Sequence, residues 1–264
     1  MSVNEKMTAI ADSIRDKTGS TEALTLDGMA SGVNEVYKSG EQAQRKDFWH
    51  NYLKHSRETA NPTTTMAYRF AYNGWTDDTF YPTEDIYVKY GNMMFYFNKV
   101  TNIKQRLEDC GVKLIFDGAN DAGAMFEQSS TTEIPTLELN KLTNPSASQR
   151  LCYYCSNLVL IEKIVSAEGT LYGNSFFRCY KLADITFDGV IGTSISFSDS
   201  PLTVESIISV ITHLKNYNET EKAGKYTLTL KDTCKTLMAA QGAIDEFGKK
   251  TYDAYIADIG WNLA

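Results

Sequence analysis

The spacing of hydrophobic positions changes along the chain, and each change predicts a different kind of element. Near the N-terminus, Ile10 and Ile14 lie one helical turn apart, and Thr18-Gly19-Ser20 ends this short helix. Apolar residues then recur at steps of three and four between positions 24 and 37. Residues 1–58 are therefore predicted to form a helical module.

The apolar stripe of this module is thin, and residues 41–47 are polar nearly all round. A helix with so little apolar surface either packs on its own domain or leans on a partner chain. A packed arm and an oligomerisation stalk both fit the pattern. In either case we expect residues 1–58 to serve attachment.

Residues 59–110 are rich in aromatic and turn-forming residues. Asn61-Pro62 breaks any helix, and the run that follows predicts short strands and turns. Apolar residues then cluster with helical spacing from Met93 to Val100, and Ile103 and Leu107 continue at a four-residue step. We expect this region to lead into a repeat domain.

A weak repeat dominates residues 111–200. Two units match closely, Cys155-x-x-Leu158-x-x-Ile161 and Cys179-x-x-Leu182-x-x-Ile185, and their three shared positions are all offset by 24 residues. A period in the twenties with one strand per unit is typical of a leucine-rich-type solenoid, whose units bury their apolar rows against one another. Short apolar strands are predicted at residues 114–116, 137–139, 161–164 and 185–187.

An earlier unit, which begins at Phe126, is a degenerate copy of this repeat. Ser129 stands where Cys is expected and Thr132 where Leu is expected, so the register of the unit stays open. The predicted repeat core consists of Cys155, Leu158, Ile161, Phe176, Cys179, Leu182 and Ile185.

After Pro201 the pattern becomes helical again. Apolar residues follow steps of three and four from Val204 to Leu214, with Thr203 as a capping residue and Glu205 in the first turn, where a carboxylate suits the helix dipole. Residues 201–264 are therefore placed to cap the open end of the repeats. Three further elements are predicted: a strand at 226–230, a helix at 236–247 and a final strand or docking segment at 259–263.

The predicted fold class is α+β: an N-terminal helical module, a short irregular leucine-rich-repeat β-solenoid and a C-terminal α/β cap. Its divisions are 1–58 for attachment or oligomerisation, 59–110 for entry to the repeats, 111–200 for the repeats and 201–264 for the cap.

Composition narrows the classes of function. The 264 residues carry a formal net charge of -7, so the chain lacks the basic surface that a nucleic-acid backbone requires. No apolar run is long enough to span a membrane, and the N-terminus has no basic start followed by an apolar segment, so neither membrane insertion nor a secretory signal is expected. The five cysteines are odd in number and scattered, which predicts buried, reduced thiols.

We expect no catalytic residue, metal or cofactor. His50 and His55 lie five positions apart and point in different directions on a helix, which suits surface histidines, as does the isolated His213. Cys152-x-x-Cys155 has half the ligands of a zinc site, and core thiols explain it better. The acidic run 117–121 lacks the twelfth-position glutamate of a calcium loop and reads as a turn.

Tyrosine is the unusual component of the sequence, with 16 residues. Many of them are expected to be half-buried packing residues, whereas exposed ones offer rigid, amphipathic contact surface to proteins or sugars. The candidate binding residues are Tyr153, Tyr154, Tyr180 and Arg178.

Several stretches resemble a known family. The two Cys-x-x-Leu-x-x-Ile units, with Cys152 or Phe176 three positions before the cysteine, resemble BspA-type leucine-rich repeats. The segment Ile10-Ala-Asp-Ser-Ile-Arg-Asp-Lys-Thr-Gly and the terminal Gly260-Trp-Asn-Leu-Ala are similar to the two ends of tail-associated proteins of bacteriophages and prophages.

This resemblance implies a non-enzymatic structural protein of a phage tail, baseplate or fibre, located in the virion. Residues 1–58 would contact other virion proteins, a homo-oligomer is expected, and the repeats would present a surface to a host glycan or protein. The alternative is a secreted bacterial surface adhesin of BspA type. A glycan hydrolase is a third reading, supported only by scattered carboxylates.

Overall fold

A computed structural model of the chain describes residues 3–19, 40, 43–44, 46–49, 70–71, 75–144 and 149–264. The chain divides into two compact units, Met1–Tyr52 and Leu53–Ala264. In the first unit, α1 (Val3–Thr18) ends where predicted, at Gly19 with φ 70°. The apolar stripe at 24–37 and the predicted boundary at 58 lie outside the described residues.

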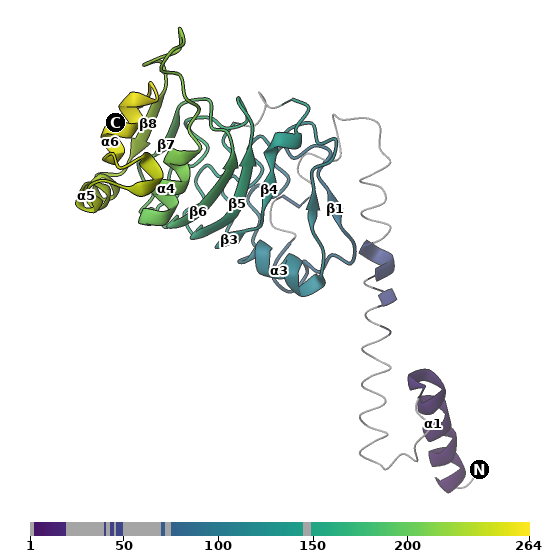
Figure 1. Cartoon of the computed structure of the whole chain (residues 1–264). Helices are drawn as coiled ribbons and strands as arrows, with labels where there is room; N and C mark the ends of the chain where they lie inside the picture. Colours follow the sequence, from purple (N-terminus) through teal and green to yellow (C-terminus); the bar gives the residue numbers. More distant parts are fainter. Residues whose placement is uncertain are drawn as a thin grey trace. The chain divides into compact units, whose positions relative to one another are not determined.

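The second unit contains parallel strand pairs that lie side by side in Figure 1. β1 (Ile86–Tyr87) pairs with β2 (Leu114–Ile115), and β5 (Leu160–Ser166) pairs with three other strands. Together with the helices, these strands give the mixed α+β class that the sequence predicts. The three strands paired with β5 are β3 (Glu133–Ile134), β4 (Leu137–Glu138) and β6 (Asp184–Gly189).

The strand register agrees with the 24-residue offset and corrects the earlier unit. Ile161 pairs with Ile185, as the offset predicts, and Ile134 pairs with Ile161 at an offset of 27. The assignment of Thr132 to the leucine position is therefore wrong, because Thr131 lies 27 residues before Leu158. Thr131 is fully buried, and its hydroxyl bonds to the Glu133 carbonyl and accepts the amide N–H of Ile103.

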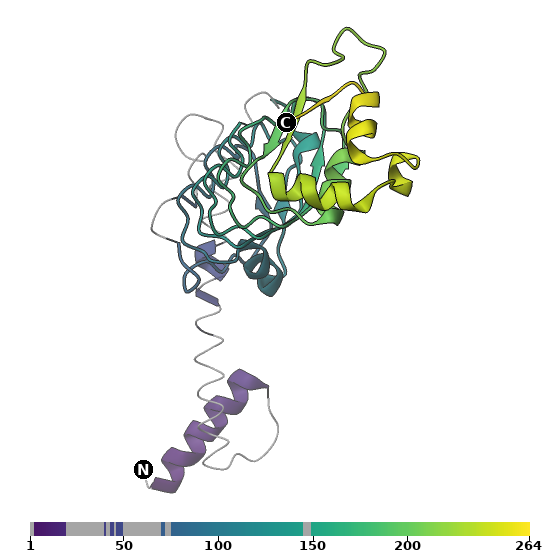
Figure 2. The ribbon, with the colours of Figure 1, turned by 90° about the vertical axis from the view of Figure 1, so that its left-hand side faces the viewer.

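Opposite the strands, the chain forms four six-residue turn segments within the described residues: 92–97, 123–128, 149–154 and 173–178. Alternate amide groups of each segment donate to the next, as from Phe95 to Met125 at 2.7 Å and from Phe126 to Leu151 at 2.9 Å. Figure 2 shows these consecutive passes of the chain side by side. The helical reading of residues 93–100 is therefore wrong, since alternate amides bond to the next segment. The amides between them, such as that of Tyr96 to the Met93 carbonyl, close turns with the residue three positions earlier.

The fourth residue of each turn segment points into the core. Phe95 stacks on Phe126 with centroids 5.1 Å apart and an interplanar angle of 2°, while Phe176 stacks on Phe197 at 4.9 Å. Cys152 occupies the position between Phe126 and Phe176, so the aromatic column is interrupted there. All five side chains are buried, which gives this narrow domain a continuous core.

Two helices stand beside the strands. α3 (Ile103–Cys110) begins at the N-cap Asn102, whose side chain accepts the amide of Gln105, and buries Ile103 and Leu107 as the four-residue step predicts. α4 (Val204–Thr212) has the predicted cap at Thr203 and takes the place of the next strand beside β6. The hydroxyls of Ser206 and Ser209 accept the amides of Ile185 and Phe187, which closes that edge of the sheet.

The C-terminal block contains a third parallel sheet. It comprises β7 (Ile195–Phe197), β8 (Thr227–Leu230) and β9 (Asn262–Leu263), with β8 in the centre. The bounds of the helix predicted at 236–247 are wrong: α5 spans Asp232–Gln241 and ends at Gly242, whose φ is 67°. The described residues also include three short helices: α6 (Tyr252–Asp258), η2 (Leu139–Lys141) and η4 (Asp245–Phe247).

Candidate functional site

Five side chains from two neighbouring turn segments form a half-exposed group on the surface, which we call the arginine–aromatic cluster. The cluster lies on the outward positions of segments 149–154 and 173–178, next to the buried fourth positions. Its members are Arg150, Tyr153, Tyr154, Phe177 and Arg178.

Cations and rings alternate through the cluster. The Arg150 guanidinium lies 4.4 Å from the Tyr153 ring centroid, and Tyr153 stacks on Phe177 at 5.1 Å with an interplanar angle of 24°. Arg178 lies 5.3 Å from the Phe177 centroid and 4.5 Å from that of Tyr154. Both guanidinium groups thus lie over ring faces, and Arg150 also donates to Glu127.

The two arginines differ in charge compensation. Arg150 forms an ion pair with Glu127, whose side chain is 2% exposed. Burial raises the pKa of Glu127, and the charge of Arg150 works against this shift. Within the described part of the chain, no carboxylate lies within ion-pair distance of the Arg178 guanidinium, although Asp199 accepts the backbone amide of Arg178 at 3.0 Å. The positive charge of Arg178 is therefore available to a ligand.

The backbone under the cluster is in an uncommon conformation. Arg150, Tyr154 and Arg178 have φ values of 61°, 62° and 59°, in the left-handed region that large side chains rarely adopt. The surrounding ladder holds them there, with the Tyr154 amide bonded to the Phe177 carbonyl at 2.8 Å. The second and sixth positions of segments 92–97 and 123–128 are left-handed as well, so this conformation belongs to the repeated turn and does not distinguish the cluster.

Three of the four candidate binding residues lie in the cluster: Tyr153, Tyr154 and Arg178. Tyr180, the fourth, is 50% exposed and takes no part in the ring contacts of the cluster. Sequence reasoning missed Arg150 and Phe177. Aligning residues 150–155 with 174–179 at the 24-residue offset, and taking the positions just before the cysteine as outward-facing, would have found Phe177 opposite Tyr153.

The predicted repeat-core residues are all buried, and two thiols bond across neighbouring segments. Cys155 Sγ donates to the Phe126 carbonyl at 2.7 Å, and Cys179 Sγ donates to the Cys152 carbonyl at 3.0 Å. Burial raises the pKa of both Cys152 and Cys179 well above the usual thiol value. Both cysteines of Cys152-x-x-Cys155 are fully buried, and Cys155 bonds to a backbone carbonyl, as packing residues do.

The remaining sequence candidates have structural explanations where the structure describes them. His213 is half-buried and bonds through Nδ1 to the Ser209 carbonyl at 2.7 Å, whereas His50 and His55 lie outside the described residues. Asp117 sits in the predicted turn and pairs with Lys141 at 2.8 Å. Among the residues described, no group of three or more His, Cys, Asp or Glu side chains is placed to hold a metal ion. Nor does any described helix have the length and apolar character to cross a membrane.

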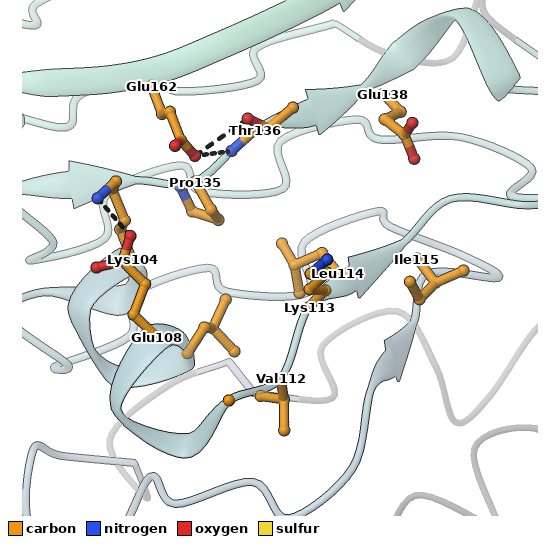
Figure 3. A pocket seen from close by; sticks show the side chains of 12 residues that line it. Lys104, Glu108, Val112, Lys113, Leu114, Ile115, Pro135, Thr136, Glu138 and Glu162 are labelled. Atoms are coloured by element: carbon orange, nitrogen blue, oxygen red, sulfur yellow. Dashed lines mark hydrogen bonds and ion pairs between the residues drawn. The ribbon is translucent and has the colours of Figure 1, made fainter.

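A groove of about 530 Å³ lies beside α3 (Figure 3), between β2 and the β3–β4 segment. Lys104 bonds to Glu108 at 2.6 Å, and Glu162 accepts both the amide and the hydroxyl of Thr136 at 3.0 Å. Most of the rim is thus bonded within the protein, and the residues that line the groove include neither His nor Cys. Apolar side chains, among them Leu107, Val112 and Ile115, lie between these bonded polar groups.

A second hollow of about 480 Å³ lies at the surface, with Glu168, His213 and Lys215 among its lining residues. Of these described features, the cluster holds the most ordered set of aromatic and charged groups. Comparison with known proteins adds no identification, because the chain matches no protein-family model, no curated protein and no solved structure.

Proposed function

We propose that this chain is a non-enzymatic structural protein of a phage tail, baseplate or fibre, in which a short leucine-rich-type solenoid carries a recognition surface. The arginine–aromatic cluster is the observation that carries the recognition part. It holds three aromatic rings in a fixed stack and one guanidinium that pairs with no carboxylate of the described residues. Arginine and tyrosine are the residues most enriched where binding energy concentrates.

The solenoid is supported by the repeated geometry of the second unit. Parallel strands pair at offsets of 27 and 24 residues, and each turn segment donates amides to the next. In a solenoid each unit contacts only its neighbours, so equivalent side chains form columns, as Phe95 and Phe126 do. The Ser206 and Ser209 hydroxyls end the ladder at α4, as a capping element would.

The virion part rests on the sequence motifs at residues 10–19 and 260–264 and on the division of the chain. Residues Met1–Tyr52 form a compact unit of their own, separate from the unit that bears the cluster. A separate attachment unit and a recognition unit suit a protein that is anchored in an assembly and faces outward. Contacts with other virion proteins and self-association through residues 1–58 belong to this proposal.

Fractionation of cells that carry the gene tests the virion assignment. After prophage induction, particles are purified on a density gradient, and the chain is sought by mass spectrometry in the particle band and in the cell envelope. Recovery with tail proteins is the expected result. Recovery only in the envelope of uninduced cells would show a surface adhesin instead and would overturn the virion assignment.

The attachment role has its own test. The mass in solution of the full chain is compared with that of a variant lacking residues 1–58, by light scattering. We expect the full chain to form an oligomer and the shortened chain to form an assembly of fewer subunits or a monomer. Two monomers would contradict self-association through this module.

A further inference from the structure

The arginine–aromatic cluster also indicates the chemistry of its ligand. We propose that it binds an acidic polysaccharide, with the Arg178 guanidinium pairing a carboxylate or phosphate group on the sugar chain. This inference rests on the proposed recognition function and narrows it to one class of ligand.

The first argument is the state of Arg178. Its guanidinium stacks on Tyr154 and Phe177, and no carboxylate in the described residues neutralises it, in contrast to Arg150 with Glu127. A stacked guanidinium keeps its N–H edge free for two parallel hydrogen bonds to a planar or tetrahedral acid group. Because the chain carries a net charge of -7, long-range electrostatics oppose a polyanion, so the attraction has to come from the local contact with Arg178.

The second argument is the supply of hydroxyl groups. The phenol groups of Tyr153 and Tyr154 form no hydrogen bond with any described residue, and neither does that of Tyr180, two positions beyond Arg178. These groups can both donate and accept, as sugar hydroxyls can. A polar ligand rich in hydroxyls would satisfy them directly.

The third argument is the repeat itself. Equivalent outward side chains on neighbouring turn segments lie about one sugar residue apart, as the 5.1 Å between Tyr153 and Phe177 illustrates. A polymer of sugars can therefore place successive units along successive segments. None of these side chains lines the groove beside α3. A protein partner would gain most from a pocket that takes an apolar side chain, and the cluster residues line neither of the two hollows described above.

Equilibrium binding of the full chain tests the proposal with defined oligosaccharides. The probes are an oligogalacturonate, its fully methyl-esterified form and a glycerol phosphate oligomer, each immobilised for biolayer interferometry. We expect binding to at least one of the two acidic probes and about tenfold weaker binding, or none, to the ester. Preference between the acidic probes tells a carboxylated glycan from a phosphate-bearing one.

Three variants locate the contact. Arg178→Gln should weaken binding about tenfold or more, and Arg178→Lys should restore only part of it, since lysine cannot form the two-point contact. The matched control is Arg106→Gln. Arg106 also stacks on a tyrosine, at 4.9 Å from Tyr81, but it has Asp77 beside it and lies away from the cluster. Circular dichroism confirms that each variant is folded.

Two outcomes would overturn the inference. Equal binding to the acidic and esterified probes would contradict an ionic contact between the glycan and Arg178. Absence of binding to every probe would show that the ligand is not an acidic glycan. If Arg178→Gln still abolished the attachment of particles to cells, the recognition role of the cluster would stand, with a protein as its ligand. Particles whose attachment is unaffected by Arg178→Gln would instead refute the recognition role of the cluster.

Discussion

The inward and outward rows of the same turn segments differ in what they contribute. The inward fourth positions hold Phe95, Phe126 and Phe176, all buried and stacked with partners on neighbouring passes of the chain. The outward positions beside them hold rings and arginines that stay half-exposed. One backbone ladder supports both rows, so the inward row can supply cohesion while the outward row is free to specify a ligand.

The outward row varies more than the inward row from one segment to the next. At the fifth position, Tyr96, Glu127, Tyr153 and Phe177 follow one another, a mixture of rings and a buried carboxylate. The inward row admits only one change of type, at Cys152. Packing inside a close-packed core tolerates little change in shape, whereas an outward side chain need only avoid its neighbours. Substitutions in the two rows should therefore fall into separate classes.

The largest effect is expected from the inward row. Phe126→Ala removes a fully buried ring that stacks on Phe95, and it should lower the free energy of unfolding by about 3–5 kcal/mol. Urea denaturation followed by circular dichroism measures it. Phe126→Leu, the control, should lose clearly less because it leaves a smaller cavity. A loss below about 1 kcal/mol for the alanine variant would mean that the stacked phenylalanine rings do not stabilise the fold.

The second-largest effect is expected at the edge of the sheet where α4 follows β6. Replacing both Ser206 and Ser209 with alanine leaves the amides of Ile185 and Phe187 without acceptors, and each orphaned donor costs about 1–3 kcal/mol. The combined loss of stability should lower the urea concentration at the midpoint of unfolding. Ser198→Ala, at an exposed serine outside this contact, is the matched control. A strand-capping role would be refuted if the double variant unfolded at the same urea concentration as the control.

A smaller effect concerns acid stability. Glu168 bonds to Lys215, Tyr217 and Lys222, and these contacts, Lys215 first, lower its pKa to about 2. Since the folded pKa is below the ordinary value of 4.5, the stabilisation is complete above that value and is lost as the pH falls towards 2. The side chain is 40% exposed, so screening limits the contribution to roughly 0.5–1 kcal/mol.

Glu168→Gln should flatten the pH dependence of the unfolding midpoint between about pH 5 and pH 2. Thermal unfolding at several pH values in that window measures the difference. Glu221→Gln, at an exposed glutamate in the following loop, controls for the loss of one negative charge. If the unfolding midpoint of both variants fell equally with pH below pH 5, the contacts of Glu168 would not stabilise the fold.

Some elements of the fold could be predicted from the sequence and others could not. The strands at 161–164 and 185–187 and the α4 cap at Thr203 were predicted, because apolar periodicity and capping chemistry are local signals. The turn segments were not. Met93 to Val100 resembles a helix in spacing, and only bonds to the segment near residue 125 give it another conformation.

The cluster was predicted in part for the same reason. Tyr153 and Tyr154 stood out as a local aromatic pair, and Arg178 was named with them as a candidate binding residue. Their alternation with Phe177 and the pairing of Arg150 with Glu127 depend on contacts between passes of the chain. No sequence pattern encodes a left-handed φ at an arginine, because local preference opposes it and tertiary bonds impose it.

That conflict gives the smallest predicted effect on stability. Arg178→Gly removes a large side chain from a left-handed position, where glycine adopts φ 59° without strain. The relief of about 1 kcal/mol should roughly cancel the loss of the contacts with Tyr154 and Phe177, worth about 0.5–1 kcal/mol. The free energy of unfolding should therefore change by less than about 0.5 kcal/mol, as measured in urea.

Arg178→Gln provides the comparison, since it loses the same contacts and keeps the strain. It should be less stable than Arg178→Gly by about 1 kcal/mol, although both variants lack the guanidinium. Equal stability of the two variants would mean that the left-handed backbone stores no strain at this position. A stable glycine variant that no longer binds would show that the outward row keeps Arg178 for recognition, at a position where cohesion alone would favour glycine.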